Sequence, residues 1–178
     1  DNKRVIVTAA PHQSGKDEYL MILMILALDI DVCYLSAKWT MRRSPIPFVK
    51  PKDIDNQGIP WPLGWLQEIV FRKFGAIPVD RKGNSGQYDS VVQELLKRDN
   101  FLLIITPEGR FDATRFRSSF LYLAKELEAE VMPVQIDYEH DTLQFLDSLN
   151  LYGSEDEVIQ RLRYCFDGVK GRKSRFKA

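Results

Sequence analysis

Near the middle of the chain, residues 101–109 read Phe101-Leu102-Leu103-Ile104-Ile105-Thr106-Pro107-Glu108-Gly109. The first five side chains are all apolar, so a strand formed here is expected to be buried on both of its faces. Strands of that kind are typical of parallel sheets covered by helices, because one-sided antiparallel strands alternate apolar and polar residues. The Pro-Glu-Gly sequence then ends the strand and places a carboxylate at its carboxyl end.

Apolar and amphipathic segments alternate on either side of this stretch. Further strands are predicted at residues 4–9, 32–36, 76–79 and 131–138, and helices at 16–28, 64–74, 88–97 and 117–127. A last helix is predicted between Ser154 and Gly168, because Ser154 and Glu157 have the spacing of a capping box. This alternation predicts an α/β fold. We expect a single domain over residues 1–178, with a mainly parallel central sheet covered by helices on both faces and a basic tail at 169–178.

Two of the predicted helices differ in their surfaces. The helix at 16–28 is apolar nearly all round, which predicts a buried helix. The helix at 64–74 is amphipathic and ends at Gly75, a typical stop signal. Its apolar residues on one side are Leu66, Ile69, Val70 and Phe74. The longest apolar run, residues 19–28, is far shorter than the roughly 20 residues that a membrane-spanning helix needs.

The composition is that of a globular protein, with 44% hydrophobic and 28% charged residues. Lys and Arg total 25, as do Asp and Glu, and this balance argues against a nucleic-acid partner. The two histidines and two cysteines have no zinc-site spacing, so no metal site is expected. Cys33 and Cys165 are expected to be free, buried thiols of a reducing compartment, which predicts a cytoplasmic location.

Positive charge is concentrated in two segments that contain no acidic residue, residues 38–52 and 170–177. Such segments are either solvated surfaces or basic sides that face anionic lipid or a phosphate-bearing substrate. Directly after the first of them, Trp61 and Trp65 occur among apolar residues. These tryptophans either pack in the core or belong to an interfacial segment at a membrane surface.

His12 and Asp17 lie between the first predicted strand and the first predicted helix. Five residues apart, they cannot share one face of a helix, but they can meet if His12 is in the loop and Asp17 is in the first turn. The carboxylate could then orient the ring and leave the other ring nitrogen as a base. The alternative is a capping aspartate beside a loop histidine. The same segment, from Ala10 to Asp17, half-matches a P-loop, but it lacks the first glycine and the Ser or Thr hydroxyl.

Two further strand ends carry polar residues where ligands of parallel sheets bind. Arg81 follows the strand at 76–79, and its guanidinium suits a phosphate oxygen. Glu108 and Gly109 follow the strand at 101–106, which indicates a site with close backbone approach. Taken alone, Asp80-Arg81 after a strand is also typical of an ordinary turn. Pro107-Glu108-Gly109 alone is also typical of a type I turn with proline at its second position.

Taken together, these segments resemble the conserved blocks of the glycerolipid acyltransferase family, whose best-known members are the acylglycerolphosphate acyltransferases. The first block, His-x-x-x-x-Asp, is matched by His12 and Asp17. The other blocks are similar to Gly75-x-Ile77-x-x-Asp80-Arg81, to Pro107-Glu108-Gly109 and to Val131-x-Pro133-Val134. The segment Arg115–Phe120 also resembles a helix start of that family. The segment between Pro107-Glu108-Gly109 and Phe120 is one residue shorter than is usual in that family. Either Arg110 or Arg115 therefore takes the place of the family's arginine.

The resemblance implies transfer of a fatty acyl group from a thioester donor, acyl-CoA or acyl-acyl carrier protein, to a hydroxyl of a lysophospholipid-like acceptor. It implies His12 and Asp17 as the general-base pair, and no cofactor beyond the co-substrate. The implied substrate-binding residues are Asp80, Arg81, Glu108, Gly109, Arg110 and Arg115. A protein acting on lipid is expected on an anionic membrane surface, peripheral on the inner face. The alternatives are a P-loop-like nucleotide enzyme and a non-catalytic module that binds lipid or an acyl carrier.

Overall fold

A computed structural model describes residues 3–12, 17, 20, 23, 27, 32–37, 41, 43–44, 59–60, 64–79, 86–109 and 115–171. The predicted site residues Asp80, Arg81 and Arg110 lie outside these ranges, as do residues 172–178 of the basic tail. The chain divides into two compact units. The first comprises residues 1–31 and 99–178, and the second comprises residues 32–98.

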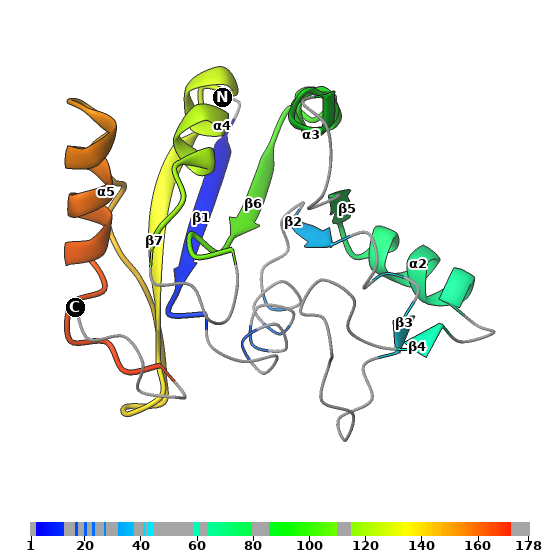
Figure 1. The fold of residues 1–178 in the computed structure, drawn as a ribbon, viewed down its shortest axis with the longest axis horizontal. Helices are drawn as coiled ribbons and strands as arrows, with labels where there is room; N and C mark the ends of the chain where they lie inside the picture. Colours follow the sequence, from blue (N-terminus) through cyan, green and yellow to red (C-terminus); the bar gives the residue numbers. More distant parts are fainter. Residues whose placement is uncertain are drawn as a thin grey trace. The chain divides into compact units, whose positions relative to one another are not determined.

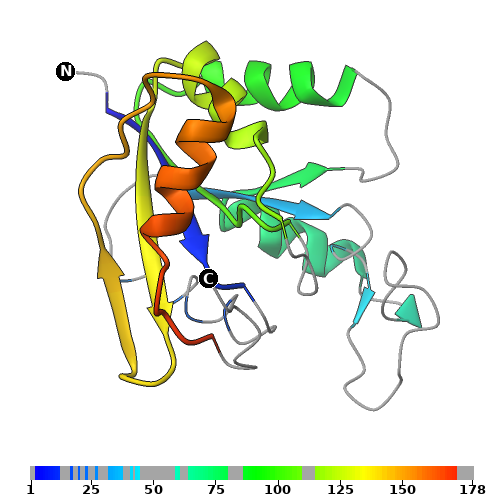
Figure 2. The same ribbon diagram turned by 60° about the vertical axis from the view of Figure 1, so that its left-hand side comes forward.

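The first unit contains three parallel strands, β6 (Phe101–Ile105), β1 (Arg4–Ala10) and β7 (Glu130–Asp137), with β1 in the middle (Figure 1). Thr8 of β1 pairs with Ile105 of β6, and Ala10 of β1 pairs with Gln135 of β7. A fourth strand, β8 (Thr142–Phe145), pairs antiparallel with β7. This hairpin is plain in Figure 2, where β7 and β8 run side by side. The three parallel strands therefore end at one common edge.

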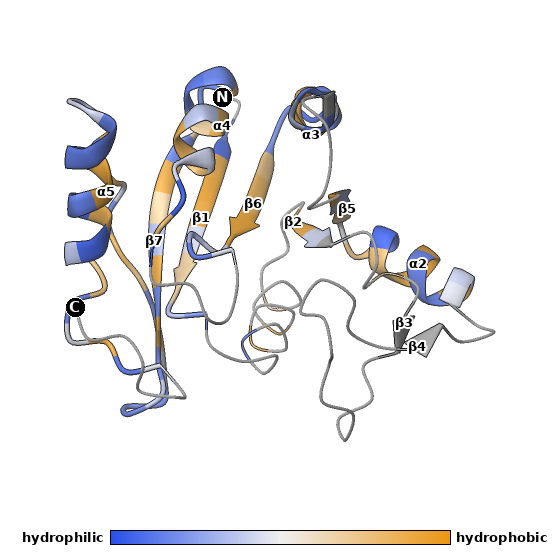
Figure 3. Cartoon of the chain, in the orientation of Figure 1, coloured by the Kyte–Doolittle hydropathy of each residue, from blue (hydrophilic) through white to orange (hydrophobic). Residues whose placement is uncertain are grey.

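Apolar burial explains why these strands form. All five residues of β6 are buried, as the uninterrupted apolar run predicts. Figure 3 shows the same pattern, with β1 and β6 apolar along most of their length. Helix α4 (Ser119–Glu126) contacts β1 and buries Phe120, Leu121, Leu123 and Ala124. Helix α5 (Glu155–Tyr164) begins with the predicted capping box, in which Ser154 and Glu157 bond each other's backbone N–H groups.

The second unit pairs β2 (Val32–Ala37) in parallel with β5 (Ala76–Val79) and also holds a short antiparallel pair, β3 (Arg43–Ser44) and β4 (Ile59–Pro60). Its helices are α2 (Gly64–Lys73) and α3 (Gly86–Leu96). Gly75 follows α2 with a φ of +83°, and a Cβ on it would collide with the carbonyl oxygen of Val32. The glycine thus both ends the helix and lets the chain pass close to β2.

The predicted α/β class with a mainly parallel sheet is confirmed, and the predicted strands and helices that fall on described residues occur within a few residues of their expected bounds. Within the predicted helix at 16–28, the four described residues are helical, but Leu23 and Ala27 are exposed, so the expected burial all round is wrong there. The exposed strand β8 was not predicted. No helix among the described residues is long and apolar enough to cross a membrane.

Candidate active site

The common edge of the three parallel strands brings together residues from three distant parts of the sequence. His12 lies two residues beyond the end of β1. Glu108 lies three residues beyond the end of β6, and Tyr138 directly follows β7. Because β1 pairs with both neighbours in parallel, the carboxyl ends of all three strands meet at this edge. All of these residues belong to the first unit.

His12 and Asp17 meet at this edge, and Tyr138 completes a chain of polar contacts. The Nδ1 atom of His12 lies 3.3 Å from Oδ2 of Asp17. The hydroxyl of Tyr138 donates a hydrogen bond of 2.5 Å to Oδ1, the other oxygen of the same carboxylate. Asp17 is fully buried and His12 is only 8% exposed. Each carboxylate oxygen therefore faces a different side chain, and the contact with His12 leaves Nε2 as the ring nitrogen directed elsewhere.

Glu108 supports the backbone of His12 from the neighbouring strand end. Its Oε1 atom accepts a hydrogen bond of 3.0 Å from the backbone N–H of His12. The side chain is fully buried, and Oε2 has no hydrogen-bond partner within the described part of the chain. Burial, the largest influence, raises the pKa of this carboxyl above its usual value of 4.5. The glutamate of the Pro-Glu-Gly turn thus fixes the loop that carries His12.

Because the pKa of Glu108 is higher in the folded chain than in the unfolded one, its ionisation opposes folding as the pH rises above 4.5. We expect Glu108→Gln to be less destabilising, relative to wild type, at pH 7.5 than at pH 4, since the amide keeps the acceptor for His12 and carries no charge. Urea unfolding at several pH values measures this difference. Glu126→Gln, on the exposed side of α4, is the matched control and should give a constant difference. If the difference in unfolding free energy between Glu108→Gln and the wild type did not change with pH, the raised pKa of Glu108 would be contradicted.

The turn that carries Glu108 is fixed by its own backbone. The N–H of Gly109 donates to the carbonyl of Thr106 at 3.0 Å, which closes a β-turn with Pro107 at its second position. Gly109 has a φ of +67°, and a Cβ there would lie 3.2 Å from Nε of Arg117. Because the Gly109 amide is engaged in the turn, an oxyanion hole in this segment would need other backbone N–H groups.

Arg117 packs against this turn, although the sequence pointed to Arg110 or Arg115. Its backbone N–H donates to the carbonyl of Pro107 at 2.8 Å, and its side chain lies over Gly109. Arg115 is exposed. Both arginines line a hollow of about 520 Å³ between the start of α4 and α5, together with Arg163, Glu155 and other residues. The guanidinium nearest to the Pro-Glu-Gly turn among the described residues is therefore that of Arg117.

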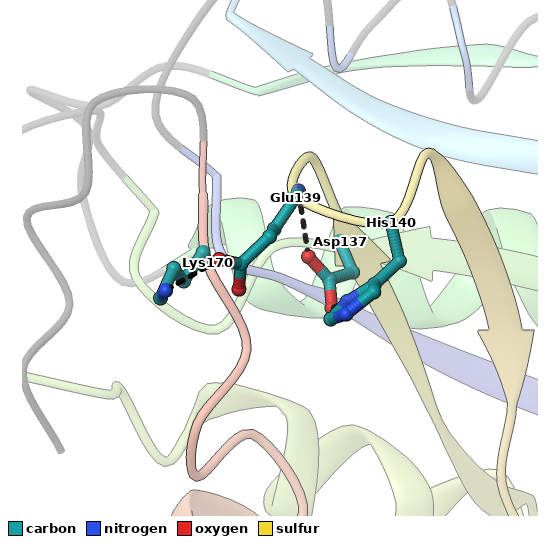
Figure 4. A network of polar contacts seen from close by, with 4 residues as sticks. All are labelled: Asp137, Glu139, His140 and Lys170. Atoms are coloured by element: carbon teal, nitrogen blue, oxygen red, sulfur yellow. Dashed lines mark hydrogen bonds and ion pairs between the residues drawn. The ribbon is translucent and has the colours of Figure 1, made fainter.

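Tyr138 is held in place at the turn between β7 and β8. Its backbone N–H donates to the carbonyl of Lys170 at 2.9 Å, and the side chain of Lys170 forms an ion pair of 2.6 Å with Glu139 (Figure 4). The segment after α5 is therefore tied to the residue that reaches Asp17. This tie explains how a surface turn can position a hydroxyl at the strand edge.

A second histidine–aspartate pair lies in the same turn. Nδ1 of His140 lies 2.8 Å from Oδ2 of Asp137, and Figure 4 shows the two side chains directed toward each other. The hydrogen bond that Asp137 accepts from His140 raises the pKa of His140 above 6.5, and the same bond lowers the pKa of Asp137. The side chain of His140 is 68% exposed, in contrast to the buried His12. The two pairs share their chemistry and differ in their surroundings.

Sequence reasoning missed Tyr138 and Arg117. Tyr138 could have been found, because it is the last residue of the strand predicted at 131–138 and lies at the edge where parallel sheets bind ligands. Arg117 lies within a segment that the resemblance singled out, but no sequence pattern shows that its side chain reaches Gly109. Among the described residues, no group of histidine, cysteine, aspartate and glutamate side chains has the geometry of a metal site.

One region of the chain is similar to a known protein family. A family model described as Acyltransferase matches residues 61–137, which include Gly75–Arg81, Pro107–Gly109 and Val131–Val134. Comparisons with curated proteins and with solved structures found no significant match. The match supports acyltransferase activity in general. Residues 61–137, somewhat less than half of the chain, are therefore similar to the acyltransferase family.

Proposed function

We propose that this chain is an O-acyltransferase that moves a fatty acyl group from a thioester donor to a hydroxyl of a lysophospholipid-like acceptor. The observation that supports this most strongly is the buried contact between His12 and Asp17 at the common strand edge. A hydroxyl is a poor nucleophile at neutral pH, so the reaction needs a positioned base. A histidine oriented by a buried carboxylate is suited to that task.

In the proposed reaction, Nε2 of His12 takes the proton of the acceptor hydroxyl while the hydroxyl oxygen attacks the thioester carbonyl. The tetrahedral intermediate then collapses, the carbon–sulfur bond breaks, and the leaving thiolate takes the proton back from His12. The products are an ester and a free thiol, so atoms and charge balance. No side chain becomes acylated, because the acceptor attacks the donor directly. Asp17 stabilises the imidazolium that forms between the two proton transfers.

Tyr138 acts on this reaction through Asp17. Its hydroxyl donates to one oxygen of the carboxylate while the other faces His12. Partners on both oxygens of a buried carboxylate fix its plane. Tyr138 is therefore a positioning residue: it holds Asp17 at the angle that orients the ring of His12.

The resemblance implies several polar residues as contacts of the acceptor and donor. Oε2 of Glu108 has no hydrogen-bond partner among the described residues, and the family resemblance implies that this carboxyl contacts an acceptor hydroxyl. Arg81 would bind the acceptor's phosphate, with Asp80 beside it, as the family resemblance implies. The resemblance likewise implies substrate contacts for Gly109 and for Arg110 or Arg115. Arg117 is a further candidate for phosphate contact, because it packs on Gly109 and lines the hollow beside α5.

Arg81→Ala should lower kcat/KM for a phosphate-bearing acceptor such as lysophosphatidate by tenfold or more. The reason is that one charge-assisted hydrogen bond contributes about 1.5–3 kcal/mol. An uncharged acceptor should be affected much less. Steady-state rates with both acceptors at a fixed donor concentration measure how much kcat/KM falls for each acceptor. An equal loss with both acceptors would contradict the phosphate role of Arg81.

The donor would be acyl-CoA or acyl-acyl carrier protein, used as a co-substrate without a further cofactor or metal. Because the acceptor and product are membrane lipids, we propose that the protein works in the cytoplasm, peripheral on the inner face of the membrane. The basic segments at residues 38–52 and 170–177 support attraction to anionic lipid.

Binding to anionic vesicles should weaken as salt rises, because salt screens the attraction between lipid and basic segments. Reversing the charges of Arg42 and Arg43 should weaken binding more than reversing Glu155 and Asp156, which lie on α5 of the other unit. Vesicle sedimentation between low and high salt measures both effects. Equal binding to neutral and anionic vesicles would contradict an electrostatic contribution.

The acyl-transfer proposal is tested by thiol release. Wild-type protein is mixed with a panel of acyl-CoA and acyl-carrier-protein donors, with and without lysophospholipid acceptors, and free thiol is measured over time. We expect release that requires both a donor and an acceptor. Magnesium-dependent nucleotide binding without thiol release would instead indicate a nucleotide enzyme, and lipid binding without thiol release would indicate a non-catalytic module.

A further inference from the structure

Helix α2 presents an apolar surface to solvent. Trp65 is 58% exposed, Leu66 43%, Ile69 53%, Val70 41% and Phe74, directly after the helix, 44%. We call these five residues the outer face of α2. An apolar side of a helix normally packs on a core and is buried. The outer face of α2 is instead exposed. In Figure 3, apolar and hydrophilic residues alternate along this short helix.

The outer face is continuous on the helix surface. At 100° per residue, Trp65, Ile69, Leu66 and Val70 span roughly 140° of the circumference. The opposite side is the one that packs: Gly64 is buried, and Gln67 and Phe71 are half-buried. The helix therefore uses its less apolar side for contact with its own unit and leaves its more apolar side outward.

The charges around the outer face all have one sign. Lys73 is exposed and lies on the same side of the helix, between Ile69 and Leu66 in angle. The one acidic residue of α2, Glu68, is turned away from the face and forms an ion pair of 2.9 Å with Arg72. The whole second unit contains eleven Lys and Arg against six Asp and Glu, and it holds all three tryptophans of the chain.

We propose that the outer face of α2 inserts into the headgroup region of an anionic lipid bilayer. An apolar surface with a tryptophan, a lysine and no acid is the combination that interfacial helices use, and the net charge of the unit complements anionic lipid. A second copy of the chain fits less well, because a symmetric contact would bring Lys73 close to its counterpart without an acid on the face to neutralise it. This inference rests on the proposed function only in its choice of lipid as partner.

The test compares variants of the whole chain in sedimentation with vesicles of phosphatidylcholine and phosphatidylglycerol. Ile69→Asp should lower vesicle affinity by about tenfold or more, since it places a charge where an apolar side chain would be buried. Val70→Thr, which nearly keeps the shape, should give a smaller loss. Leu96→Asp is the matched control, because Leu96 of α3 is 42% exposed in the same unit. It should bind vesicles like the wild type.

Three results would overturn the proposal. The first is vesicle binding that Ile69→Asp leaves unchanged, or that Leu96→Asp lowers as much. The second is a dimer in light scattering that Ile69→Asp dissociates without affecting vesicle binding, which would assign the face to a second copy. The third is a loss of thermal stability in both Ile69→Asp and Val70→Thr with vesicle binding retained, which would show that the chain itself covers the face.

Failure of the docking proposal is distinguishable from failure of the acyl-transfer proposal. Thiol release is measured with a short-chain donor and an acceptor that are both soluble as monomers. Ile69→Asp should retain wild-type rates in that assay. Retained rates together with unchanged vesicle binding would overturn the docking proposal alone. Vesicle binding that depends on Ile69 in a chain that releases no thiol would leave docking in place and overturn the acyl-transfer proposal.

Discussion

Replacing His12 with alanine is expected to lower kcat/KM for acyl transfer by about 10²–10⁴-fold, the range that a positioned general base contributes. The fold should survive, because Glu108 accepts from the backbone N–H of residue 12, which alanine retains. Rates of thiol release and a thermal unfolding curve measure the two effects separately. His140→Ala is the matched control: it removes the other histidine that contacts an aspartate, at an exposed position.

The control should keep near-normal rates. A His12→Ala protein that is folded and nearly as fast as the wild type would show that His12 is not the base. Equal losses in His12→Ala and His140→Ala would show that the assay reports a general loss of structure.

Asp17→Asn is expected to have the next largest effect, a loss of roughly 10- to 100-fold in kcat. The amide can present its oxygen to His12 and its nitrogen to the hydroxyl oxygen of Tyr138, so the orientation of the ring is kept. What is lost is the charge that stabilises the imidazolium, and a charge-assisted hydrogen bond contributes about 1.5–3 kcal/mol. Asp17→Asn should therefore be milder than His12→Ala, with KM nearly unchanged.

The same series tests whether Tyr138 acts through Asp17. Tyr138→Phe alone should lower kcat several-fold. In the double variant with Asp17→Asn it should add little, because residues that act as a unit are not additive. Tyr122→Phe is the matched control, since the Tyr122 hydroxyl donates to Glu155 at 2.7 Å away from the strand edge. Full additivity of Tyr138→Phe and Asp17→Asn would contradict the positioning role.

Elements with a strong local sequence pattern were predicted correctly from the sequence. Residues 101–105 are apolar without interruption, and all five are buried in β6. The last helix was predictable because Ser154 and Glu157 satisfy each other's backbone groups, an interaction that spans only three residues. Strand β8 was missed because its alternation is weak and its side chains are largely exposed, so pairing with β7 defines it more than its own residues do.

The candidate site was predictable only in part. The resemblance pointed to His12, Asp17 and Glu108, but not to the contact of Tyr138 with Asp17, which joins residues 121 positions apart. The direction in which side chains point was the feature that the sequence predicted least well. The apolar side of α2 was recognised, yet local periodicity cannot tell whether such a side faces the core or a partner, and here it is exposed. Likewise, periodicity could not show that Glu108 turns toward the backbone of His12.

The most direct test of the account measures both products of the proposed reaction at once. Wild-type protein is incubated with an acyl thioester and a lysophospholipid, and free thiol and acylated acceptor are quantified together with the intact mass of the protein. We predict equal amounts of thiol and ester, dependence of both on the acceptor hydroxyl, and a protein mass that the donor alone does not change. Thiol released without a matching ester, or a protein that becomes acylated by the donor, would contradict direct transfer by the His12–Asp17 pair.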